Sequence, residues 1–290
     1  MTAAAPEQIT PPVAGHGEGP VWHAGWPGLR WVDMLVGDVL ELSPAGVRRT
    51  HVGSVVAALR PVAGGGTVLA LERGFALADD DLADVRPLGE LWTDTGVRMN
   101  EGGCDPDGRF YCGSMAYDEQ PGAGTLFRLD GDGSVVPVLH GVTTSNGLAW
   151  SPDGATAYYV DTPTGRVDAF DYVDGELTDR RPVALIPDDA GTPDGLTVDA
   201  DGRLWVALWG GGAVHCYASD GALLERLALP TTNVTACTFG GPNLGTLFVT
   251  TSQQGIDPAE EPAAGALFRA DVDAVGQPVL PYGAGTMIRP

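Results

Sequence analysis

Short runs of β-branched and aromatic residues, each bounded by Gly, Pro or Asp, recur along the whole chain. Apolar positions at the spacing of an amphipathic helix are almost absent from it. Runs of this length with turn-forming residues on both sides are typical of β-strands. The pattern therefore predicts an all-β fold built from many short strands.

One pattern, a turn with Gly followed by an apolar or aromatic strand, occurs six times. The strands are marked by Trp31, Leu69, Tyr111, Tyr159, Trp205 and Phe248. Successive markers are 38, 42, 48, 46 and 43 residues apart, which fits propeller blades of about 40 to 50 residues. A further strand led by Gly follows each marker, so each unit predicts a hairpin. We expect a six-bladed β-propeller with four-stranded antiparallel blades around a central channel.

The repeat fills the chain without a linker. Gly and Pro are abundant, with 42 and 23 residues, but they are spread over the whole sequence, so we expect one domain, residues 1–290. A ring of blades avoids an open edge when a strand from one end of the chain completes a blade at the other end. Two segments can supply that strand, EQIT from Glu7 or PVLPY from Pro278. The pattern leaves both open.

A third series of segments precedes the markers and predicts the innermost strand of each blade. Its members begin at Glu18, Val56, Glu101, Asn146, Asp194 and Thr235. Innermost strands run side by side around the channel, so their equivalent ends meet at one mouth. Four of these starting segments carry acidic or amide side chains: Glu18, Asn100 with Glu101, Asn146 and Asp194. The series predicts a ring of oxygens at one mouth of the channel.

Two carboxylates and one amide oxygen, from Glu18, Asp194 and Asn146, suit a hard divalent cation, with Asn100 as a candidate fourth ligand. Carboxylates gathered without Lys or Arg would otherwise repel one another. The Asn-Gly and Asp-Gly pairs also have a purely structural interpretation, because Asn and Asp before Gly favour turns. Residue types and spacing leave both interpretations open.

The charge of the chain argues against one class of partner. With 16 Lys and Arg against 38 Asp and Glu, the formal net charge is −22, and such a field repels a phosphate backbone. We expect no nucleic-acid binding. The apolar stretches fall far short of the roughly 20 residues that span a bilayer, and residues 1–12 lack the basic and apolar regions of a secretory signal. We expect a cytoplasmic protein with no membrane contact, monomeric or weakly homo-oligomeric.

Other catalytic patterns are missing from the sequence. Ser145 stands outside any GxSxG motif, so covalent catalysis is not expected. The five His residues lack zinc-site spacing. His16, two residues before Glu18, is placed to line the mouth, but we expect it to be a solvated loop residue. The four Cys residues form no CxxC pair and predict buried free thiols. Most Trp residues predict core packing, with Trp209 as a candidate for stacking on a substrate.

Five segments, in this order, resemble the gluconolactonase, regucalcin and luciferin-regenerating enzyme family. They are GEGPVW from Gly17, RMNEGGCDPDGRFYCGSM from Arg98, TSNGLAWSPDGATAYYVDT from Thr144, PDGLTVDADGRLWVALWGGG from Pro193 and TACTFGG from Thr235. Members of this family are six-bladed propellers that bind one divalent cation in the channel and, where they are enzymes, mostly hydrolyse sugar lactones. The resemblance implies that Glu18, Asn146 and Asp194 hold the metal and that Arg98 and Asn100 contact the substrate.

The chain departs from the family pattern at two positions. Glu101 stands where the family usually has Asp after the Asn of its RxN motif, which adds a methylene near the channel. Asp118 aligns with a Glu that bonds sugar hydroxyls in many members, and its reach is shorter. We predict Arg98, Asn100 and Asp118 as substrate contacts, and the preferred sugar stays open.

The resemblance implies a small-molecule lactone as substrate and one divalent cation as cofactor. Ca²⁺ suits all-oxygen ligation best, with Zn²⁺, Mn²⁺, Mg²⁺ or Fe²⁺ as alternatives. Such a cation can polarise the carbonyl, and we choose Asp194 as general base for the attacking water, with metal-activated water as the competing version. Arg98 either binds substrate oxygens through its fork of donors or forms a structural salt bridge to Glu101 or Asp118.

Two other functions stay open on the sequence. An organophosphate hydrolase of the related propeller type would use the cation on a phosphoryl oxygen as readily as on a carbonyl. A calcium-binding regulatory protein without catalysis would use the cation site alone. Arg98 and Asn100 argue against the latter, because cation storage has no need for a donor fork beside the metal.

Overall fold

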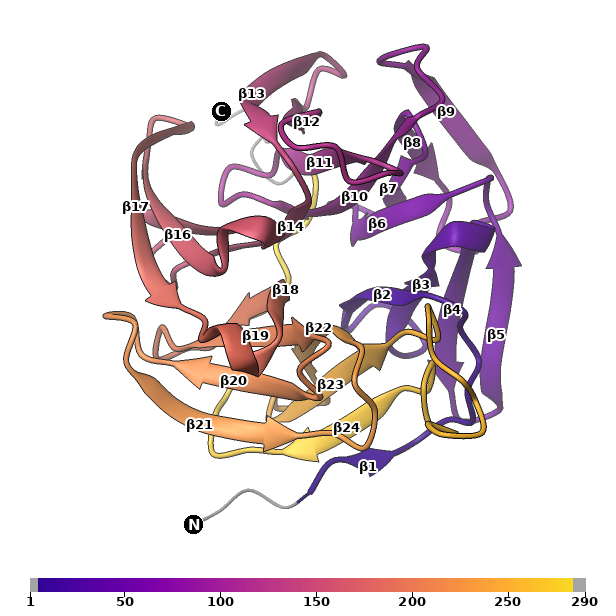
Figure 1. The fold of residues 1–290 in the computed structure, drawn as a ribbon. Coiled ribbons are helices and arrows are strands. Elements are labelled where there is room, and N and C mark those ends of the chain that lie inside the picture. Colours follow the sequence, from indigo (N-terminus) through magenta and orange to yellow (C-terminus); the bar gives the residue numbers. More distant parts are fainter. Residues whose placement is uncertain (1–4, 284–290) are drawn as a thin grey trace.

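The computed structural model describes residues 5–283. Two ends of the chain lie outside the described residues: residues 1–4 and residues 284–290. The first belongs to the segment considered for a secretory signal, and the second to the end of the expected single domain. Within residues 5–283 the strands form six four-stranded sheets. Figure 1 shows these sheets as blades arranged in a ring. The predicted six-bladed all-β propeller is confirmed.

Each blade has four strands, counted here outward from the channel. The innermost strands are β2 (Gly17–Val21), β6 (Val56–Pro61), β10 (Val97–Cys104), β14 (Ser145–Trp150), β18 (Thr192–Val198) and β22 (Val234–Gly240). The second strands are β3 (Arg30–Asp33), β7 (Thr67–Leu71), β11 (Phe110–Ala116), β15 (Thr156–Asp161), β19 (Leu204–Trp209) and β23 (Thr246–Thr251). The third strands are β4 (Asp38–Ser43), β8 (Gly74–Ala78), β12 (Gly124–Leu129), β16 (Arg166–Val173), β20 (Ala213–Tyr217) and β24 (Phe268–Asp271). The outermost strands are β5 (Gly46–His51), β9 (Val85–Glu90), β13 (Val135–Val142), β17 (Glu176–Leu185), β21 (Leu223–Ala228) and β1 (Glu7–Gln8).

The innermost strands surround the channel as a closed ring. Each contacts the innermost strand of the next blade, and β22 contacts β2. All six predicted starts lie in these strands, and all six marker residues lie in the second strands. The repeat read from the sequence therefore corresponds to the blades of the structure.

Burial decreases from the channel toward the outer edge of each blade. The second strands are almost wholly buried, whereas the outermost strands β5 and β9 are mostly exposed. Large side chains fill the space between blades: the rings of Tyr111 and Trp150 lie 5.5 Å apart, and those of Trp205 and Phe239 lie 5.7 Å apart. All four Cys residues are buried and free. The predictions of buried thiols and of core packing for Trp150 and Trp205 are confirmed.

The N-terminal segment closes the ring. β1 pairs antiparallel with β24, with Glu7 opposite Arg269, so the last blade has the order β1-β24-β23-β22. Backbone bonds continue the pairing beyond the strand, since Ile9 N–H donates to Leu267 O at 2.9 Å. Of the two segments that the sequence left open, EQIT from Glu7 supplies the closing strand.

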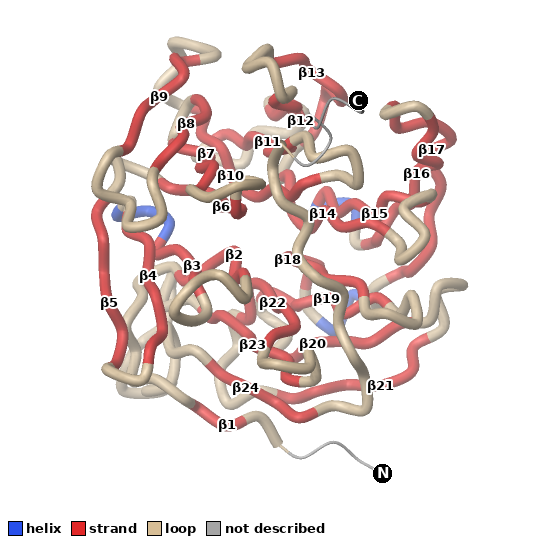
Figure 2. The backbone as a smooth tube through the Cα atoms, turned by 180° about the vertical axis from the view of Figure 1, so that it is seen from behind, coloured by secondary structure: helices blue, strands red, loops and turns tan. Residues whose placement is uncertain are grey.

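The other segment, PVLPY, crosses one end of the channel instead. Gly276, shortly before it, forms an isolated bridge with Asp199, and Tyr282, its last residue, forms one with Val62. Figure 2 shows this stretch as a loop that runs over the ring beside β14 and β18. The end that it crosses is the one where the innermost strands finish, which we call the far mouth.

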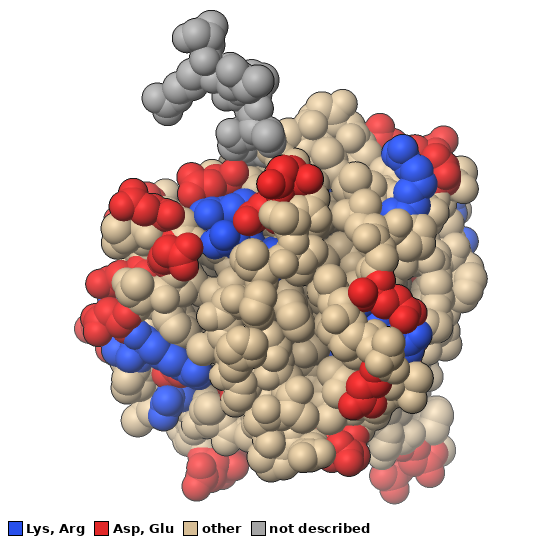
Figure 3. All heavy atoms as spheres, turned by 90° about the horizontal axis from the view of Figure 1, so that it is seen from above, with Lys and Arg blue, Asp and Glu red and all other residues tan. Residues whose placement is uncertain are grey.

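The helices of the described residues are three short 3-10 turns, η1 (Met34–Val36), η2 (Thr162–Thr164) and η3 (Asp188–Ala190). A helix of three residues is too short to cross a bilayer, and residues 5–283 offer no longer one. On the side of the molecule seen in Figure 3, Asp and Glu lie in groups around the outline, several of them beside Arg. This surface agrees with the net charge of −22.

Candidate functional site

The predicted metal and Arg-x-Asn residues lie at the end of the channel where the innermost strands begin, which we call the site mouth. They are Glu18 on β2, Arg98, Asn100 and Glu101 on β10, Asn146 on β14 and Asp194 on β18. Every one of them is at most 7% exposed. Four blades thus contribute polar side chains to one end of the channel, as the repeat predicts.

Each of these strands is irregular where it carries its site residue. The pairing register shifts directly after Glu18 in β2, and the shifts in β10, β14 and β18 enclose Asn100, Asn146 and Asp194. A β-bulge leaves a residue out of the ladder and redirects its side chain. The bulges therefore free Asn100, Asn146 and Asp194 from regular strand pairing, whereas Glu18 stays paired with Val32 at the edge of its irregularity.

The glycines that follow Asn146 and Asp194 lie inside strands and not in turns. A Cβ atom at Gly147 would lie 2.7 Å from a backbone nitrogen of β18, and one at Gly195 would lie 2.5 Å from a side chain of β22. These distances are too short for any side chain, so glycine is required by the close approach of the next innermost strand. The turn interpretation is therefore wrong for these two pairs.

The turn interpretation is correct for three other Asp-Gly pairs. Asp107-Gly108, Asp153-Gly154 and Asp201-Gly202 lie between the innermost and second strands of their blades, at the far mouth. The φ angles of the three glycines are 78°, 71° and 81°. This left-handed region favours glycine because other residues suffer a steric penalty there.

A chain of hydrogen bonds orients the amide of Asn146. Arg98 Nη1 donates to Asn100 Oδ1 at 2.6 Å, and Asn100 Nδ2 donates to Asn146 Oδ1 at 2.9 Å. Asn100 Nδ2 also donates to the carbonyl of Ser145 at 2.8 Å, and Asn146 Nδ2 donates to Thr162 Oγ1 at 2.7 Å. Because the oxygen of Asn100 accepts from Arg98, Asn100 acts in this arrangement by orienting Asn146.

Burial, joined by like charges at Glu18 and Asp194, raises the proton affinity of the carboxylates at the site mouth. Burial, and next the Glu101 carboxylate, raises the pKa of Glu18 well above its usual value. Burial, followed by the charges of Glu18 and Glu101, does the same for the pKa of Asp194. Burial raises the pKa of Glu101 to about 7 against the opposing charge of Arg60. A bound cation would offset the cost of gathering these charges.

His16 is buried at the site mouth, so the prediction of a solvated loop histidine is wrong. Its Nδ1 lies 2.9 Å from Ser252 Oγ, and its Nε2 lies 3.8 Å from Glu18 Oε1. Burial, and then the charge of Arg98, lowers the pKa of His16 to about 3 despite the nearby Asp33. The imidazole is neutral at neutral pH. The available signal was spacing, because positions 16 and 18 share one face of an extended chain.

Only one of the three guanidinium nitrogens of Arg98, Nη1, donates hydrogen bonds among the described contacts. Besides the Asn100 amide, its guanidinium donates to the carbonyl of Met99 at 3.0 Å and to Met34 Sδ at 3.1 Å, and the described contacts include no ion pair with Glu101 or Asp118. The Arg98 Nε–H is buried without a partner among the described residues. An unsatisfied buried donor is costly, and Nη2 likewise donates no hydrogen bond among the described contacts.

Two further predicted residues lie at the rim. Asp118 is exposed in the loop between β11 and β12, where its Oδ1 accepts the backbone N–H of Gln120 at 3.2 Å. Trp209 is half-buried, and its ring lies 5.9 Å from that of His16 in an edge-on arrangement. Contact of Asp118 or Trp209 with a substrate stays a prediction.

The donor set decides whether a cation fits. Residues 5–283 contain no group of three His, Cys, Asp or Glu side chains placed to hold one ion. A cation site here therefore depends on the amide oxygen of Asn146 beside the carboxylates of Glu18 and Asp194. Two buried carboxylates with raised pKa values and one oriented amide fit a hard divalent cation. The ligand roles of the three residues stay predictions.

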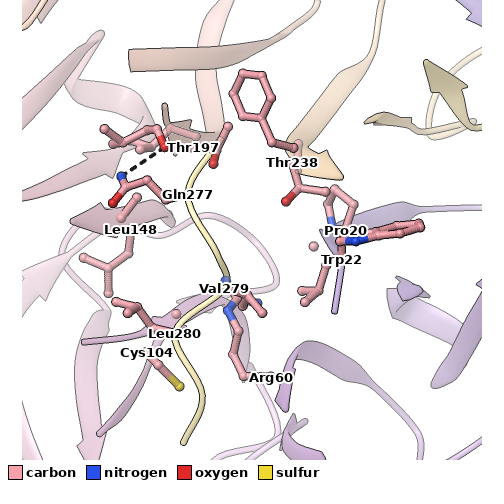
Figure 4. A pocket seen from close by; sticks show the side chains of 18 of the residues that line it. Pro20, Trp22, Arg60, Cys104, Leu148, Thr197, Thr238, Gln277, Val279 and Leu280 are labelled. Atoms are coloured by element: carbon pink, nitrogen blue, oxygen red, sulfur yellow. Dashed lines mark hydrogen bonds between the residues drawn. The ribbon is translucent and has the colours of Figure 1, made fainter. Parts of the chain in front are cut away.

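A separate cavity of about 110 Å³ occupies the channel toward the far mouth. Its walls are the last residues of the innermost strands, and residues 277–280 border it. Figure 4 shows Arg60 and Val279 at this cavity. Glu101 also borders it, and Glu101 Oε2 has no hydrogen-bond partner among the described residues. The cavity thus lies behind the site residues and is distinct from the site mouth.

Comparison with known protein families matches residues 16–253 to the SMP-30/Gluconolactonase/LRE-like region. The matched stretch runs from His16, at the site mouth, to the residues that follow β23 in the last blade. It contains Glu18, Asn146 and Asp194. The match therefore covers most of the propeller.

Individual relatives match over nearly their whole length. Pentonolactonase XacC from Haloferax volcanii is 38% identical over 275 residues, which cover 90% of this chain and 92% of the relative. Regucalcin from Danio rerio is 35% identical over 263 residues, with 87% and 89% covered. The solved structure of a calcium-binding protein, regucalcin from Agrobacterium tumefaciens, has a TM-score of 0.90 at 27% identity and covers 97% of this chain and 98% of its own. The relatives thus include a protein named for lactone hydrolysis and one named for calcium binding.

Proposed function

The chain belongs to the SMP-30/gluconolactonase/LRE-like family, and from this we infer that it opens a sugar lactone by hydrolysis. The relative named pentonolactonase supports this substrate class. One structural observation carries the proposal: bulged strand starts bring buried carboxylates, an oriented amide and an unpaired guanidinium N–H to one mouth of the channel. Such a set can hold a cation and leave a donor for the substrate beside it.

Glu18, Asn146 and Asp194 are the proposed ligands of one divalent cation. Ca²⁺ suits this set best because all three ligand atoms are oxygens, with Zn²⁺, Mn²⁺, Mg²⁺ or Fe²⁺ as alternatives. The calcium-binding regucalcin among the similar structures supports Ca²⁺. When bound, the cation supplies a Lewis acid that polarises the lactone carbonyl.

Asp194 is the proposed general base of the hydrolysis. Water forms a new bond to the carbonyl carbon while its proton passes to the Asp194 carboxylate. The bond between that carbon and the ring oxygen then breaks, and the proton returns to the ring oxygen, which leaves as a hydroxyl group. The product is the open-chain aldonic acid.

The other site residues bind and orient the substrate. An unpaired guanidinium N–H of Arg98 donates to a substrate oxygen, and the fixed fork of donors sets the direction of that bond. Asn100 keeps the amide of Asn146 turned toward the site. Asp118, at the rim, is proposed to reach the sugar hydroxyls. The donors of Arg98 give the site a use beyond cation binding.

Hydrolysis assays with three substrates test the proposed function. Gluconolactone, xylonolactone and a phosphotriester are each incubated with the protein, with and without a chelator. We expect both lactones to be opened faster than in buffer and this activity to disappear with the chelator. Activity on the phosphotriester alone would instead identify an organophosphate hydrolase. Calcium binding without any hydrolysis would identify a regulatory protein.

Elemental analysis of two variants tests the ligand assignment. Asp194→Ala removes a proposed ligand from an Asp-Gly pair inside a strand, and Asp201→Ala changes an Asp-Gly pair in an exposed turn at the far mouth. We expect bound metal to be lost from the first variant and kept by the second. Undiminished metal in Asp194→Ala would contradict the assignment.

A further inference from the structure

Polar contacts at the site mouth lead outward from Arg98 to the rim. The central carbon of the Arg98 guanidinium lies 5.6 Å from the centre of the Tyr117 ring. The Tyr117 hydroxyl donates to Glu72 Oε1 at 2.8 Å, and Ser54 Oγ donates to Glu72 Oε2 at 2.9 Å. This series of contacts joins the site to the second and third blades. None of Tyr117, Glu72 and Ser54 was singled out from the sequence.

The topology places Tyr117 and Glu72 at the site mouth. Glu72 directly follows β7, and Tyr117 directly follows β11. Both second strands run antiparallel to their innermost strands β6 and β10. They therefore end at the level where the innermost strands begin, which is the level of Arg98 and Asn100.

Tyr117 presents an unusual surface. Its side chain is 46% exposed, and among the exposed large apolar side chains of residues 5–283 it is the only aromatic one. The ring lies over Arg98, which itself is only 7% exposed. Exposed apolar surface beside convergent polar groups is typical of a ligand-binding site.

The contacts of Tyr117 hold its ring in place. Burial and the hydrogen bond to Glu72 raise the pKa of Tyr117 to about 12, so the hydroxyl remains a donor at neutral pH. Burial opposes ionisation of Glu72, but the bonds from Tyr117 and Ser54 lower its pKa below the usual value. A hydrogen bond to a charged acceptor is stronger than one to a neutral acceptor. The ring is thus fixed before any ligand arrives.

We propose that Tyr117 is a specificity-determining residue whose ring packs against the exocyclic group of an aldonolactone. This inference rests on the proposed function. The C–H bonds of a sugar form an apolar patch that suits an aromatic face, and a fixed aromatic ring loses little conformational entropy when it binds. Glu72, held by Ser54, acts as a positioning residue through the Tyr117 hydroxyl. Arg98 binds oxygens of the same substrate on the inner side.

Two lactones that differ by one group test this inference. D-glucono-1,5-lactone carries an exocyclic hydroxymethyl group that D-xylono-1,5-lactone lacks. For Tyr117→Ala we expect kcat/KM for the gluconolactone to fall about tenfold, mainly through KM, and kcat/KM for the xylonolactone to change less than about twofold. As a matched control, Glu176→Gln alters an exposed carboxylate at the outer edge of a blade and should leave both values unchanged.

Variants of Glu72 separate positioning from a merely structural effect. Glu72→Ala frees the Tyr117 hydroxyl, so it should shift the ratio of the two kcat/KM values in the same direction by a smaller factor. Glu72→Gln keeps an oxygen that accepts the hydroxyl proton and should restore the wild-type ratio. If Tyr117→Ala folds poorly, Tyr117→Phe keeps the ring, loses the same tether and should behave like Glu72→Ala.

Three results would overturn the inference. One is an unchanged ratio of kcat/KM values in a folded Tyr117→Ala protein, and another is an equal fall for both lactones carried by kcat. The third is a wild-type protein that opens neither lactone, and this result would overturn the proposed function as well. The first two leave the proposed function intact.

Discussion

Asp194 and Asp199 belong to the same blade, five residues apart, and lie at opposite ends of the channel. Both are buried, with 5% and 0% of their surface exposed. Asp199 is saturated with donors: the backbone N–H groups of Asp201 and Arg203 at 3.0 and 2.9 Å, Arg203 Nε at 2.7 Å and Trp205 Nε1 at 3.0 Å. Its charge is balanced by the protein itself.

Asp194 has the opposite surroundings. Its neighbours at the site mouth include the carboxylates of Glu18 and Glu101, and its pKa is raised by burial and by their charges. Buried acidic residues of one blade can thus differ in role, and the groups around each carboxylate indicate which role it has. A carboxylate saturated by donors, as at the far mouth, stabilises a turn. A carboxylate left among like charges is a candidate position for a ligand that offsets them.

The third blade repeats the arrangement at the far mouth. Asp105 is fully buried and accepts Arg109 Nε at 2.7 Å, the backbone N–H of Arg109 at 2.8 Å and the hydroxyl of Tyr172 at 2.7 Å. The same residue pattern, Asp-x-Asp-Gly-Arg, supplies both cases. The arrangement at the far mouth therefore occurs in two blades and is not particular to Asp199.

The largest expected effect is on catalysis by Asp194→Asn. An amide oxygen can still act as a ligand, but it cannot accept the proton of the attacking water, so turnover should fall by about 10²- to 10⁴-fold. In chelator, the free energy of unfolding of the variant should be at least that of wild type, because the substitution removes one of several like charges. Measurements are kcat on the better lactone, bound metal and the denaturant midpoint. Wild-type turnover with metal retained would assign activation of the water to another group.

Asp199→Ala should produce the reverse pattern. The substitution removes the buried one of two carboxylate partners of Arg203 and the acceptor of a buried Trp N–H, so we expect a loss of about 3–5 kcal/mol in the free energy of unfolding. Activity per folded molecule should stay unchanged because the change lies at the far mouth. Urea unfolding and a lactonase assay on the same preparation check both parts. A loss of activity without a loss of stability would break the distinction between the two mouths.

The sequence predicted the blades because their signals are local and repeated. Markers such as Trp31 and Trp205 combine strand propensity with nearby turn residues, and six copies reinforce one another. The same equivalence predicted that Glu18, Asn146 and Asp194 share one mouth, since corresponding positions of a repeat occupy corresponding places. No knowledge of side-chain contacts was needed for either result.

Other features depend on distances between blades, which no local pattern contains. Gly147 and the turn residue Gly202 each follow an Asn or Asp, so the sequence does not distinguish them. What distinguishes Gly147 is the close approach of the next innermost strand. His16 is buried by its contacts with Ser252, at the other end of the chain. The closing strand β1 has two residues, Glu7 and Gln8, too few to show a period. The Arg98–Tyr117 contact lies within one blade, but it depends on the register of β10 against β11, which no local pattern contains either.

Ca²⁺ should stabilise the folded protein by binding at the site mouth, and a substitution at the far mouth should not alter this stabilisation. A ligand that binds the folded state at 100 times its Kd adds about 2.7 kcal/mol to the free energy of unfolding. We expect a shift of this order when Ca²⁺ is added to chelator-treated wild type, and the same shift in Asp201→Ala. Asp194→Ala should show none. Denaturant unfolding at fixed ionic strength measures the shift, and an equal response of all three proteins would indicate binding elsewhere.

The smallest effect is expected for a carboxylate that is paired but exposed. Glu7 and Arg269 form an ion pair of 2.7 Å between the closing strand β1 and β24, with side chains 63% and 52% exposed. Water screens such a pair, so Glu7→Gln should cost about 0.2–1 kcal/mol, far less than Asp199→Ala. The difference from wild type should shrink further at high salt. Urea unfolding at two salt concentrations checks this.

Deletion of residues 1–12 is the matching test of the backbone pairing. It removes the pairing of β1 with β24 as well as the ion pair, so it should lower the free energy of unfolding clearly more than Glu7→Gln does. If the two changes lower it equally little, β1 contributes little beyond its ion pair, and closure of the ring depends on contacts inside the blades.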